Sequence, residues 1–336
     1  MKVLLTGCPG WLGNRLLEVL TKGWEGKGPE RNWELRCLVQ PELDVSFINR
    51  LSKDIEVSYG SLLGKDSLRQ ACQGVEMVIH LAGLIHPRKI SDLYAVNSRG
   101  TSYLLEAAVA AGARRFIYIS SNSPAGVNTD RHIPMKESDT PNPWLNYGLS
   151  KLRAEHYVNT ARQEKKLQTV ILRPCWFYGP QQPRRQTRFF HMIKKGNPII
   201  FGDGKNLRSM SYVDNTCQAI LLAATTEQAD GQTYWVADEK PYPTNEIYAT
   251  VAALLGVQNF KPMHVPAFAS DLCLLADRAL QYLGLYEMNI HVAAEMTRDI
   301  SVSVEKAKTE LGYKPKIELK EGMWRSIEWC RAQGML

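Results

Sequence analysis

Tyr147 and Lys151 lie one helical turn apart in the run Tyr-Gly-Leu-Ser-Lys. Side chains at i and i+4 share a helix face, so a helix here brings the phenol and the ammonium together. A nearby cation favours phenolate and lowers the pKa of a tyrosine, which then takes a proton from a hydroxyl or returns one. The pair predicts acid–base chemistry on an alcohol or a ketone. The alternative is an ordinary pair on a solvated helix face.

Small polar residues, Ser120 to Ser123, follow an apolar run that ends at Ile119. A hydroxyl at the carboxyl end of a central strand points into the ligand crevice of a parallel sheet, where it can hold a substrate oxygen. Ser121 is a candidate for that role. A hydrogen-bonding turn is the alternative, and it is the stronger interpretation for Ser120 and Ser123.

Three glycines, Gly7, Gly10 and Gly13, follow the first strand-like run and open a helical pattern. Glycine allows a tight turn and lets the backbone approach a pyrophosphate without a Cβ, while the helix N-terminus offers free N–H groups to the phosphates. This placement predicts a dinucleotide site, and an ordinary glycine turn is the alternative.

The elements that must position these residues follow a βαβ rhythm. We expect strands at 2–6, 34–40, 56–59, 77–82, 115–120 and 169–173, and helices at 11–21, 66–72, 91–111 and 147–164. Six strands with intervening crossovers predict an α/β fold, a Rossmann-type doubly wound parallel sheet. Such a sheet binds its ligand beyond the carboxyl ends of its strands.

From about residue 179, proline and glycine punctuate shorter elements, and a smaller α/β substrate lobe is expected. Later helices are expected at 213–225, 245–255, 266–283, 303–311 and 320–331. We place a dinucleotide-binding Rossmann domain at 1–178 and a mainly substrate-binding lobe at 179–336. Segments at about 205–240 are expected to return to the first domain.

Composition excludes several classes of protein. Of 336 residues, 44% are hydrophobic and 22% are charged, which is ordinary globular usage. The net charge, 41 − 34 = +7, is spread along the chain. The densest basic stretch, at Arg184, Arg185 and Arg188, is too short for a nucleic-acid stripe. We therefore expect a small-molecule substrate and no nucleic-acid partner.

Seven cysteines are scattered without a CxxC pair, which is typical of reduced thiols, and we expect no metal site. A strand-like run at the N-terminus argues against a signal peptide. The apolar stretch 267–285 contains Asp271, Asp277 and Arg278, so we expect no membrane span. These features predict a cytoplasmic protein.

The combined motifs resemble the extended short-chain dehydrogenases/reductases of the NAD-dependent epimerase/dehydratase type, over nearly the whole chain. The resemblance rests on residues 6–13, 80–83, 97–101, 120–121, 147–151, 173–180, 212–215 and 306–315. It implies a nicotinamide cofactor, with Tyr147 as acid/base, Ser121 as catalytic hydroxyl, and Lys151 holding the nicotinamide ribose. The cofactor-binding residues that it implies are Gly7, Gly10, Trp11, Leu12, Gly13, Gln40, Ser61, Leu62, Leu81, Ala82, Gly83, Asn97, Tyr147, Lys151 and Pro174.

Three departures from that family matter. Where NAD-preferring members carry an acid at the end of the second strand, this chain has Val39, and Gln40 replaces the arginine of many NADP-preferring members. NAD and NADP therefore both stay open, with NAD expected for an epimerase. Ser61, before Leu62, replaces an adenine-contacting Asp. An Asp-Glu pair of the dehydratases is absent after Ser121, so 4,6-dehydration is not expected.

On the substrate side, Arg208 resembles an arginine that grips the diphosphate of nucleotide sugars, a role that suits a guanidinium fork. A structural ion pair is the alternative. Asn122 and Trp176 are further expected substrate contacts, although aromatic residues are more often core. The apolar stretch 266–285 resembles a segment of 3β-hydroxysteroid dehydrogenase-like members. We expect it to be a buried helix, with a dimer face as the alternative.

Three functions remain possible. The leading hypothesis is an NAD(P)-dependent epimerase or oxidoreductase acting on a secondary alcohol, most plausibly of a nucleotide-activated sugar. The second is net dehydrogenation or reduction of an apolar, steroid-like or flavonoid-like substrate. A non-catalytic dinucleotide sensor ranks last, because the chain keeps both Tyr147 and Lys151. The resemblance also implies a possible homodimer.

Overall fold

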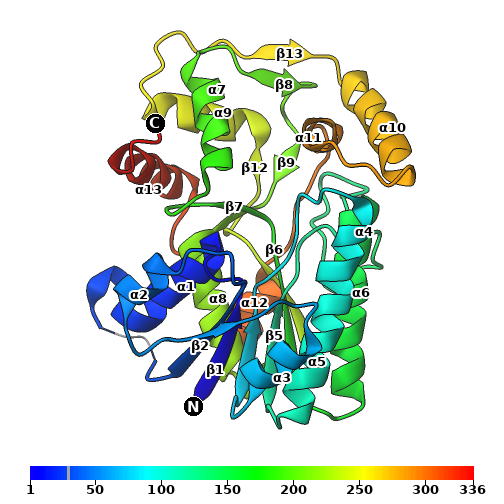
Figure 1. Ribbon diagram of the computed structural model, residues 1–336. Helices are drawn as coiled ribbons and strands as arrows, with labels where there is room; N and C mark the ends of the chain where they lie inside the picture. Colours follow the sequence, from blue (N-terminus) through cyan, green and yellow to red (C-terminus); the bar gives the residue numbers. More distant parts are fainter. Residues whose placement is uncertain (29–30) are drawn as a thin grey trace.

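The computed structural model describes residues 1–28 and 31–336 (Figure 1). Its centre is a seven-stranded parallel sheet in the order β11-β6-β5-β4-β1-β2-β3. The strands are β1 (Lys2–Thr6), β2 (Glu34–Val39), β3 (Glu56–Tyr59), β4 (Met77–His80), β5 (Arg115–Ile119), β6 (Gln168–Pro174) and β11 (Gln232–Val236). This sheet confirms the predicted doubly wound fold. Six of the strands were expected, and β11 was not.

Helices cover both faces of the sheet because its strands are apolar on both sides. In β1, Val3 and Leu5 join one core and Leu4 joins the other, and all three are fully buried. The first core is covered by α1 (Trp11–Lys22), α2 (Ser46–Leu51), α8 (Val213–Thr225) and α12 (Glu305–Leu311). The second is covered by α3 (Lys65–Cys72), α5 (Thr101–Ala110) and α6 (Leu145–Gln163).

The helix expected at 91–111 is not uniform. It consists of α4 (Ile90–Leu93), a π-helical segment η2 (Tyr94–Gly100) and then α5. A π turn widens the helix and is often found at functional sites. Here it contains Asn97, which is almost fully buried. The sequence pattern predicted the helix but not its π-helical segment.

The second lobe lies above the carboxyl ends of the strands (Figure 1). Its own core gathers Phe190, Tyr212, Ile247 and Met323. The lobe contains β7 (Trp176–Tyr178), α7 (Thr187–Lys194), β8 (Ile199–Phe201), β9 (Leu207–Arg208), β10 (Met210–Tyr212), β12 (Tyr242–Pro243), α9 (Thr244–Leu254), β13 (Met263–Val265), α10 (Phe268–Tyr282), α11 (Met288–Glu295) and α13 (Leu319–Ala332). Short 3-10 turns are η1 (Trp24–Gly26), η3 (Arg184–Gln186) and η4 (Glu227–Ala229).

The chain crosses between the lobes more than once. After β10 it returns to the sheet as α8 and β11, goes back to the upper lobe, and returns again as α12 (Figure 1). α8 packs against α1, and α12 packs against α8 and β11. The division at residue 178 stays a prediction.

The helix at 266–285 corrects an expectation. It forms, as α10, but it is not buried: Phe268, Leu272, Leu275 and Tyr282 are 62, 58, 61 and 91% exposed. Its buried residues are polar, namely Ser270, Asp277 and Gln281. The helix is thus apolar on its outer face, against the usual pattern of a surface helix. Within the described residues, no helix has the length and apolar character needed to cross a membrane.

Candidate active site

The glycine run makes a close corner between β1 and α1. Gly7 has φ +90°, and a Cβ there would lie 2.8 Å from the backbone nitrogen of Ala82. Cβ atoms at Gly10 and Gly13 would lie 2.6 and 2.5 Å from the Gly7 carbonyl oxygen. Among the residues that the structure describes, no side chain caps the N-terminus of α1, and the first turn of the helix carries no acidic residue. Free N–H groups and the absence of a Cβ suit a pyrophosphate, so these residues fit a dinucleotide.

The glycine corner lies close to Lys151. Ala82, which packs against Gly7, is followed by Gly83, where a Cβ would lie 3.6 Å from Lys151 Nζ. Lys151 Nζ donates a hydrogen bond of 2.8 Å to the carbonyl oxygen of Ile119, at the end of β5. The structure therefore brings the glycine corner and the lysine of the predicted pair to one edge of the sheet, as the motifs indicated.

Asn97 supports this edge from behind. Its Oδ1 accepts from the Leu84 N–H at 2.7 Å, and its Nδ2 donates to the Leu84 carbonyl and the Ser150 hydroxyl at 2.9 and 3.0 Å. A Cβ on Gly83 would lie 3.5 Å from Asn97 Oδ1. Because all these bonds are made inside the protein, Asn97 fixes the loop after β4 against α6, next to Lys151.

Tyr147 and Ser121 meet in front of the sheet. Both side chains are half-buried and share a hydrogen bond. Burial raises the pKa of Tyr147 to about 12, the bond with Ser121 opposes the rise, and the Glu295 carboxylate adds to it. Ser121 Oγ also lies 3.4 Å from Asn122 Oδ1 and accepts from the Ser123 N–H at 3.3 Å. The hydroxyl, the phenol and a turn of polar groups thus converge at one point.

The expected effect of Lys151 on Tyr147 does not appear in this structure. Burial lowers the pKa of Lys151 to about 7, while Glu155 opposes the shift. Its Nζ lies over the Tyr118 ring, 4.4 Å from the centroid, as well as on the Ile119 carbonyl. Burial is the main cause of both pKa shifts, and neither group shifts the pKa of the other, although the spacing suggested that they would.

A buried ion pair between Arg173 and Glu155 lies close to Lys151. Arg173 Nη2 lies 2.6 Å from Glu155 Oε2, and the side chains are 7 and 3% exposed. Ser120 donates to Glu155 Oε1 at 2.5 Å. This network joins β5, β6 and α6, so it fixes the helix that carries both Tyr147 and Lys151.

His80, at the end of β4, is held as a neutral ring. Its two nitrogens lie 2.7 and 2.9 Å from the hydroxyls of Thr6 and Thr101. Burial, together with the charge of Lys151, lowers its pKa to about 3. Because both ring nitrogens are engaged inside the protein, His80 is a packed residue of the sheet edge.

The remaining predicted cofactor residues line the same edge. Gln40 is exposed directly after β2, Val39 is buried, and neither offers a charge to a ribose. Ser61 is half-buried and accepts from the Leu63 N–H at 3.2 Å, and Leu62 packs against Gly100. Among the others, Trp11 donates to the Pro180 carbonyl at 2.7 Å, Pro174 ends β6, and Leu12 and Leu81 are half-buried against the first core.

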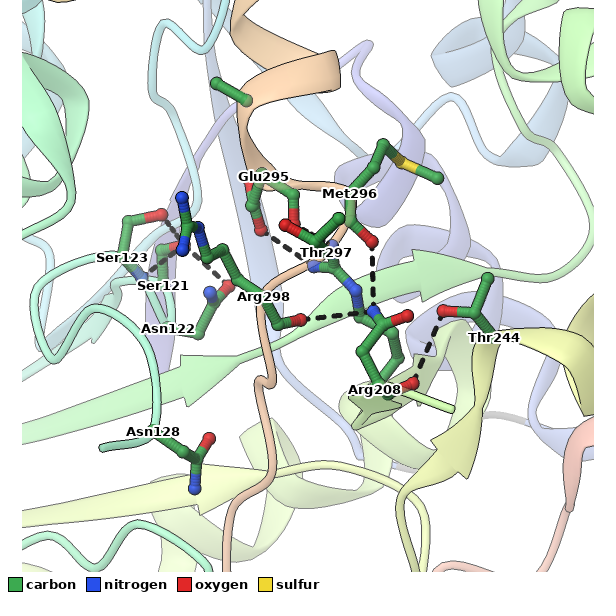
Figure 2. A network of polar contacts seen from close by, with 12 residues as sticks. Ser121, Asn122, Ser123, Asn128, Arg208, Thr244, Glu295, Met296, Thr297 and Arg298 are labelled. Carbon is green, nitrogen blue, oxygen red and sulfur yellow. Dashed lines mark hydrogen bonds and ion pairs between the residues drawn. The ribbon is translucent and has the colours of Figure 1, made fainter. Parts of the chain in front are cut away.

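The predicted substrate contacts lie in two places. Asn122 belongs to the turn beside Ser121, whereas Trp176 lies in β7 with its ring centroid 5.8 Å from that of Phe189. Arg208 is engaged inside the protein: Nη1 donates to Glu295 Oε1 at 2.9 Å and Nη2 to the Glu295 carbonyl at 2.5 Å (Figure 2). The structural ion pair left open above is therefore present.

Two residues near this site escaped the sequence analysis, Glu295 and Arg298. Glu295 ends α11, close enough to affect the pKa of Tyr147. The Arg298 side chain points toward the Ser121–Ser123 turn (Figure 2), with Cζ 6.0 Å from the Trp144 ring centroid, and pairs with Asp271 at 2.5 Å. Its Nε is buried without a hydrogen-bond partner among the described residues. No motif marked either one, because Glu295 is the last residue of α11 and Arg298 lies in the turn that follows it.

Comparison with known proteins identifies the family of this chain. Residues 3–237 match the NAD dependent epimerase/dehydratase family. The protein y4nL of Sinorhizobium fredii (strain NBRC 101917 / NGR234) is 40% identical over 343 residues, which cover 99% of this chain and 96% of y4nL.

Solved structures share the whole architecture. The crystal structure of gox2253 superposes with a TM-score of 0.82 at 26% identity, over 99% of both chains. UDP-glucose 4-epimerase from Thermotoga maritima, solved with UDP-glucose, gives 0.79 at 22% identity over 99% of both chains. UDP-glucuronic acid 4-epimerase from Bacillus cereus, solved with NAD, gives 0.78 at 22% over 99% of both chains. At these identities the two epimerases share the fold.

Proposed function

Because the chain belongs to the NAD dependent epimerase/dehydratase family, and is therefore an NAD(P)-dependent enzyme of the extended short-chain dehydrogenase/reductase type, we propose that it epimerises or oxidises a secondary alcohol of a nucleotide-activated sugar. The observation that supports this proposal most is the position of Lys151 beside the glycine corner, on the helix that also carries Tyr147 next to Ser121. The sugar nucleotides named for two structural neighbours support the choice of substrate class.

The residues that would hold the dinucleotide follow from the geometry. The Gly7 corner and the N-terminus of α1 suit the pyrophosphate, and Lys151, next to Gly83, suits the nicotinamide ribose. When bound, the nicotinamide supplies the hydride acceptor and donor. The chain's own residues position the substrate and move its proton.

In this proposal Tyr147 Oη exchanges the proton of the substrate hydroxyl. With its pKa at about 12, the phenol is neutral at rest and suited to return a proton to an alkoxide. An anionic ligand beside Lys151 favours the charged ammonium, and that charge then favours phenolate for the opposite step. Ser121 Oγ, already hydrogen-bonded to Tyr147, holds the reacting oxygen of the substrate. The unpartnered Nε of Arg298 is a further donor for a polar group of the substrate.

Turnover of Tyr147→Phe tests the acid–base assignment. With UDP-glucose and UDP-glucuronic acid as probes and NAD present, turnover should fall by ~10²–10⁴, the usual contribution of such a group. Tyr157→Phe, at an exposed position on the same helix, is the matched control and should keep full turnover. Survival of turnover within a factor of ~10 in Tyr147→Phe would remove this residue from the proton transfer.

Net oxidation or reduction of an uncharged alcohol or ketone is the second candidate, and one observation favours it. Both arginines near the site are paired with carboxylates, Arg208 with Glu295 and Arg298 with Asp271. A pocket whose cations are neutralised attracts a diphosphate less strongly. Absorbance of the reduced nicotinamide separates the two candidates: net redox accumulates or consumes it in step with product, and epimerisation leaves it unchanged.

A further inference from the structure

α10 turns its polar residues inward. Asp277 pairs with His291 at 2.7 Å, and Gln281 accepts a hydrogen bond of 2.8 Å from α6. Ser270 donates to a carbonyl of α11 at 2.7 Å. Because these partners hold the polar side of the helix, its apolar side faces outward, and Figure 1 shows α10 at the outer edge of the upper lobe. An exposed apolar surface of this kind marks a site of interaction with a protein or a membrane.

The outward side of α10 and the turn that follows it form one apolar patch. Its members are 51 to 91% exposed, and they are Phe268, Leu272, Leu275, Tyr282, Leu283 and Leu285. The first four lie on one face of the helix, since they are separated by 4, 3 and 7 residues. An aromatic ring stands at each end of the helix, with leucines between the rings. Aromatic rings prefer the boundary between water and lipid hydrocarbon, and leucines are typical of the side of an interfacial helix that enters the lipid.

Exposed cations border the apolar patch. Arg278 lies on α10, and Arg88 and Lys89 lie in the loop before α4. That loop contacts the patch, because the Ile90 N–H donates to the carbonyl of Gly284, in the middle of the turn after α10, at 3.1 Å. Lys and Arg beside an apolar helix face are the residues that attract anionic lipid head groups.

The acids of this region are engaged within the chain. Asp271, which is exposed on α10, pairs with Arg298. Asp92 accepts from a backbone N–H at the start of α4 at 3.1 Å, and Glu287 caps α11 by accepting from the Ile290 N–H at 2.8 Å. The charge left to meet a partner at the apolar patch is therefore positive, and it complements an anionic surface.

We propose that the apolar patch docks α10 on the surface of a membrane that contains anionic lipid. The rings and leucines enter the head-group layer, and Arg88, Lys89 and Arg278 contact lipid phosphates. With 15 residues and a polar inner side, α10 lies on the bilayer and does not cross it. The docking is independent of the substrate class proposed above. Because α10 also holds Asn146, the neighbour of Tyr147, the docked helix is one that supports the candidate active site.

Sedimentation with vesicles tests the docking. The probes are mixed vesicles of phosphatidylglycerol and phosphatidylcholine in equal parts, and neutral vesicles of phosphatidylcholine alone. Wild type should pellet with the mixed vesicles and bind the neutral ones ~10-fold or more weakly, since each cation at an anionic surface strengthens binding by a factor of about 5. A wild type that stays in solution with the mixed vesicles, or that binds both kinds equally, overturns the proposal.

Substitutions separate the apolar and the charged parts of the surface. The double variant Leu272→Ser, Leu275→Ser should bind the mixed vesicles ~10-fold or more weakly, because two leucines no longer enter the lipid. The matched control is Leu43→Ser, Leu63→Ser, at leucines 41 and 47% exposed in the loops after β2 and β3, far from α10 in Figure 1, and it should bind like wild type. Arg278→Gln should weaken binding to the mixed vesicles about 5-fold. Unchanged binding by the Leu272, Leu275 double variant overturns the docking surface.

A fluorescent label tests the contact while the leucines stay in place. In a Cys273→Ser background, where the other cysteines are buried, Tyr282→Cys carries an environment-sensitive dye. Its emission should shift to the blue with the mixed vesicles, and the same dye on Leu43→Cys should not shift. An unshifted dye at position 282 contradicts the docking. A wild type that ignores both kinds of vesicle, but forms a dimer that Leu272→Ser with Leu275→Ser abolishes, overturns the proposal in favour of a second copy of the chain.

Discussion

Lys151 is a buried ammonium whose protonation state should make the stability of this protein depend on pH. Its side chain is almost fully buried, and burial holds its pKa at about 7. In the unfolded chain a lysine titrates near ~10.4. Between these values the unfolded chain binds one more proton than the folded protein, so the free energy of unfolding rises with pH across that window. Lys151→Met removes the titrating group and should remove this rise.

The size of the effect follows from the two pKa values. Full linkage amounts to ~1.4 kcal/mol per pH unit between them. Between pH ~6 and ~9, the free energy of unfolding of wild type should rise by ~2.5 kcal/mol more than that of Lys151→Met. The rise is smaller than full linkage because Lys151 in the folded protein still loses its proton at the lower end of this range. The buried carboxyl of Asp238, whose pKa burial raises to about 7, is present in both proteins and cancels in the comparison.

Urea denaturation at a series of pH values measures this difference. Lys53→Met, at an exposed lysine in the turn before β3, is the matched control and should follow wild type at every pH. Unfolding free energies of wild type and Lys151→Met that run parallel from pH ~6 to ~9 would show that Lys151 is not desolvated, and would remove the basis for its proposed place beneath the ribose.

Three further outcomes follow from the same structure. Gly7→Ala should cost ~1–3 kcal/mol in urea denaturation and weaken NAD binding in calorimetric titration, because φ is +90° and the new Cβ meets Ala82; an unchanged protein would contradict the close corner. Gln40→Asp should shift affinity toward NAD over NADP by ~10-fold or more, since the carboxylate repels a 2′-phosphate. Equal affinities would place the adenosine ribose elsewhere. Arg173→Met should destabilise the protein by ~3–5 kcal/mol, because it leaves Glu155 buried without its cation; wild-type stability would contradict the contribution of this ion pair.

The sheet was largely predictable because its strands are short apolar runs and its crossover helices are periodic. β1, β3 and α8 have the expected bounds, and α6 begins two residues earlier than expected. β11 was missed: only its last residues, among them Tyr234 and Trp235, are buried, and the strand belongs to the sheet through contacts distant in sequence. Pairing of distant segments leaves little trace in local periodicity.

The site was predictable where a motif fixes both residue type and spacing. The run from Gly7 to Gly13 forms a close corner next to Ala82, and Lys151 Nζ lies near Gly83 at the same edge of the sheet, as the spacing predicts; the catalytic roles of Tyr147 and Lys151 stay predictions. The pKa of Tyr147 was not predictable, because spacing carries no measure of burial, and burial decides its direction. An ion pair of Arg208 was considered, but its partner Glu295 was not predictable, since the two residues are 87 positions apart.

The face of α10 shows the limit of composition alone. A run of Leu and Ala with few charges predicts a helix, and its burial was assumed by analogy with ordinary cores. The structure reverses the orientation because Asp277, Ser270 and Gln281 find partners inside. Polar partners distant in sequence, not hydropathy, decide which face of this helix turns inward.

A crystal structure of the protein with NAD bound tests the central claim most directly. The account predicts the pyrophosphate against Gly7 and the N-terminus of α1, with Lys151 Nζ and Tyr147 Oη both within hydrogen-bond distance of the nicotinamide ribose. A nicotinamide bound away from this pair, with Tyr147 and Lys151 contacting neither ribose nor ring, would contradict it.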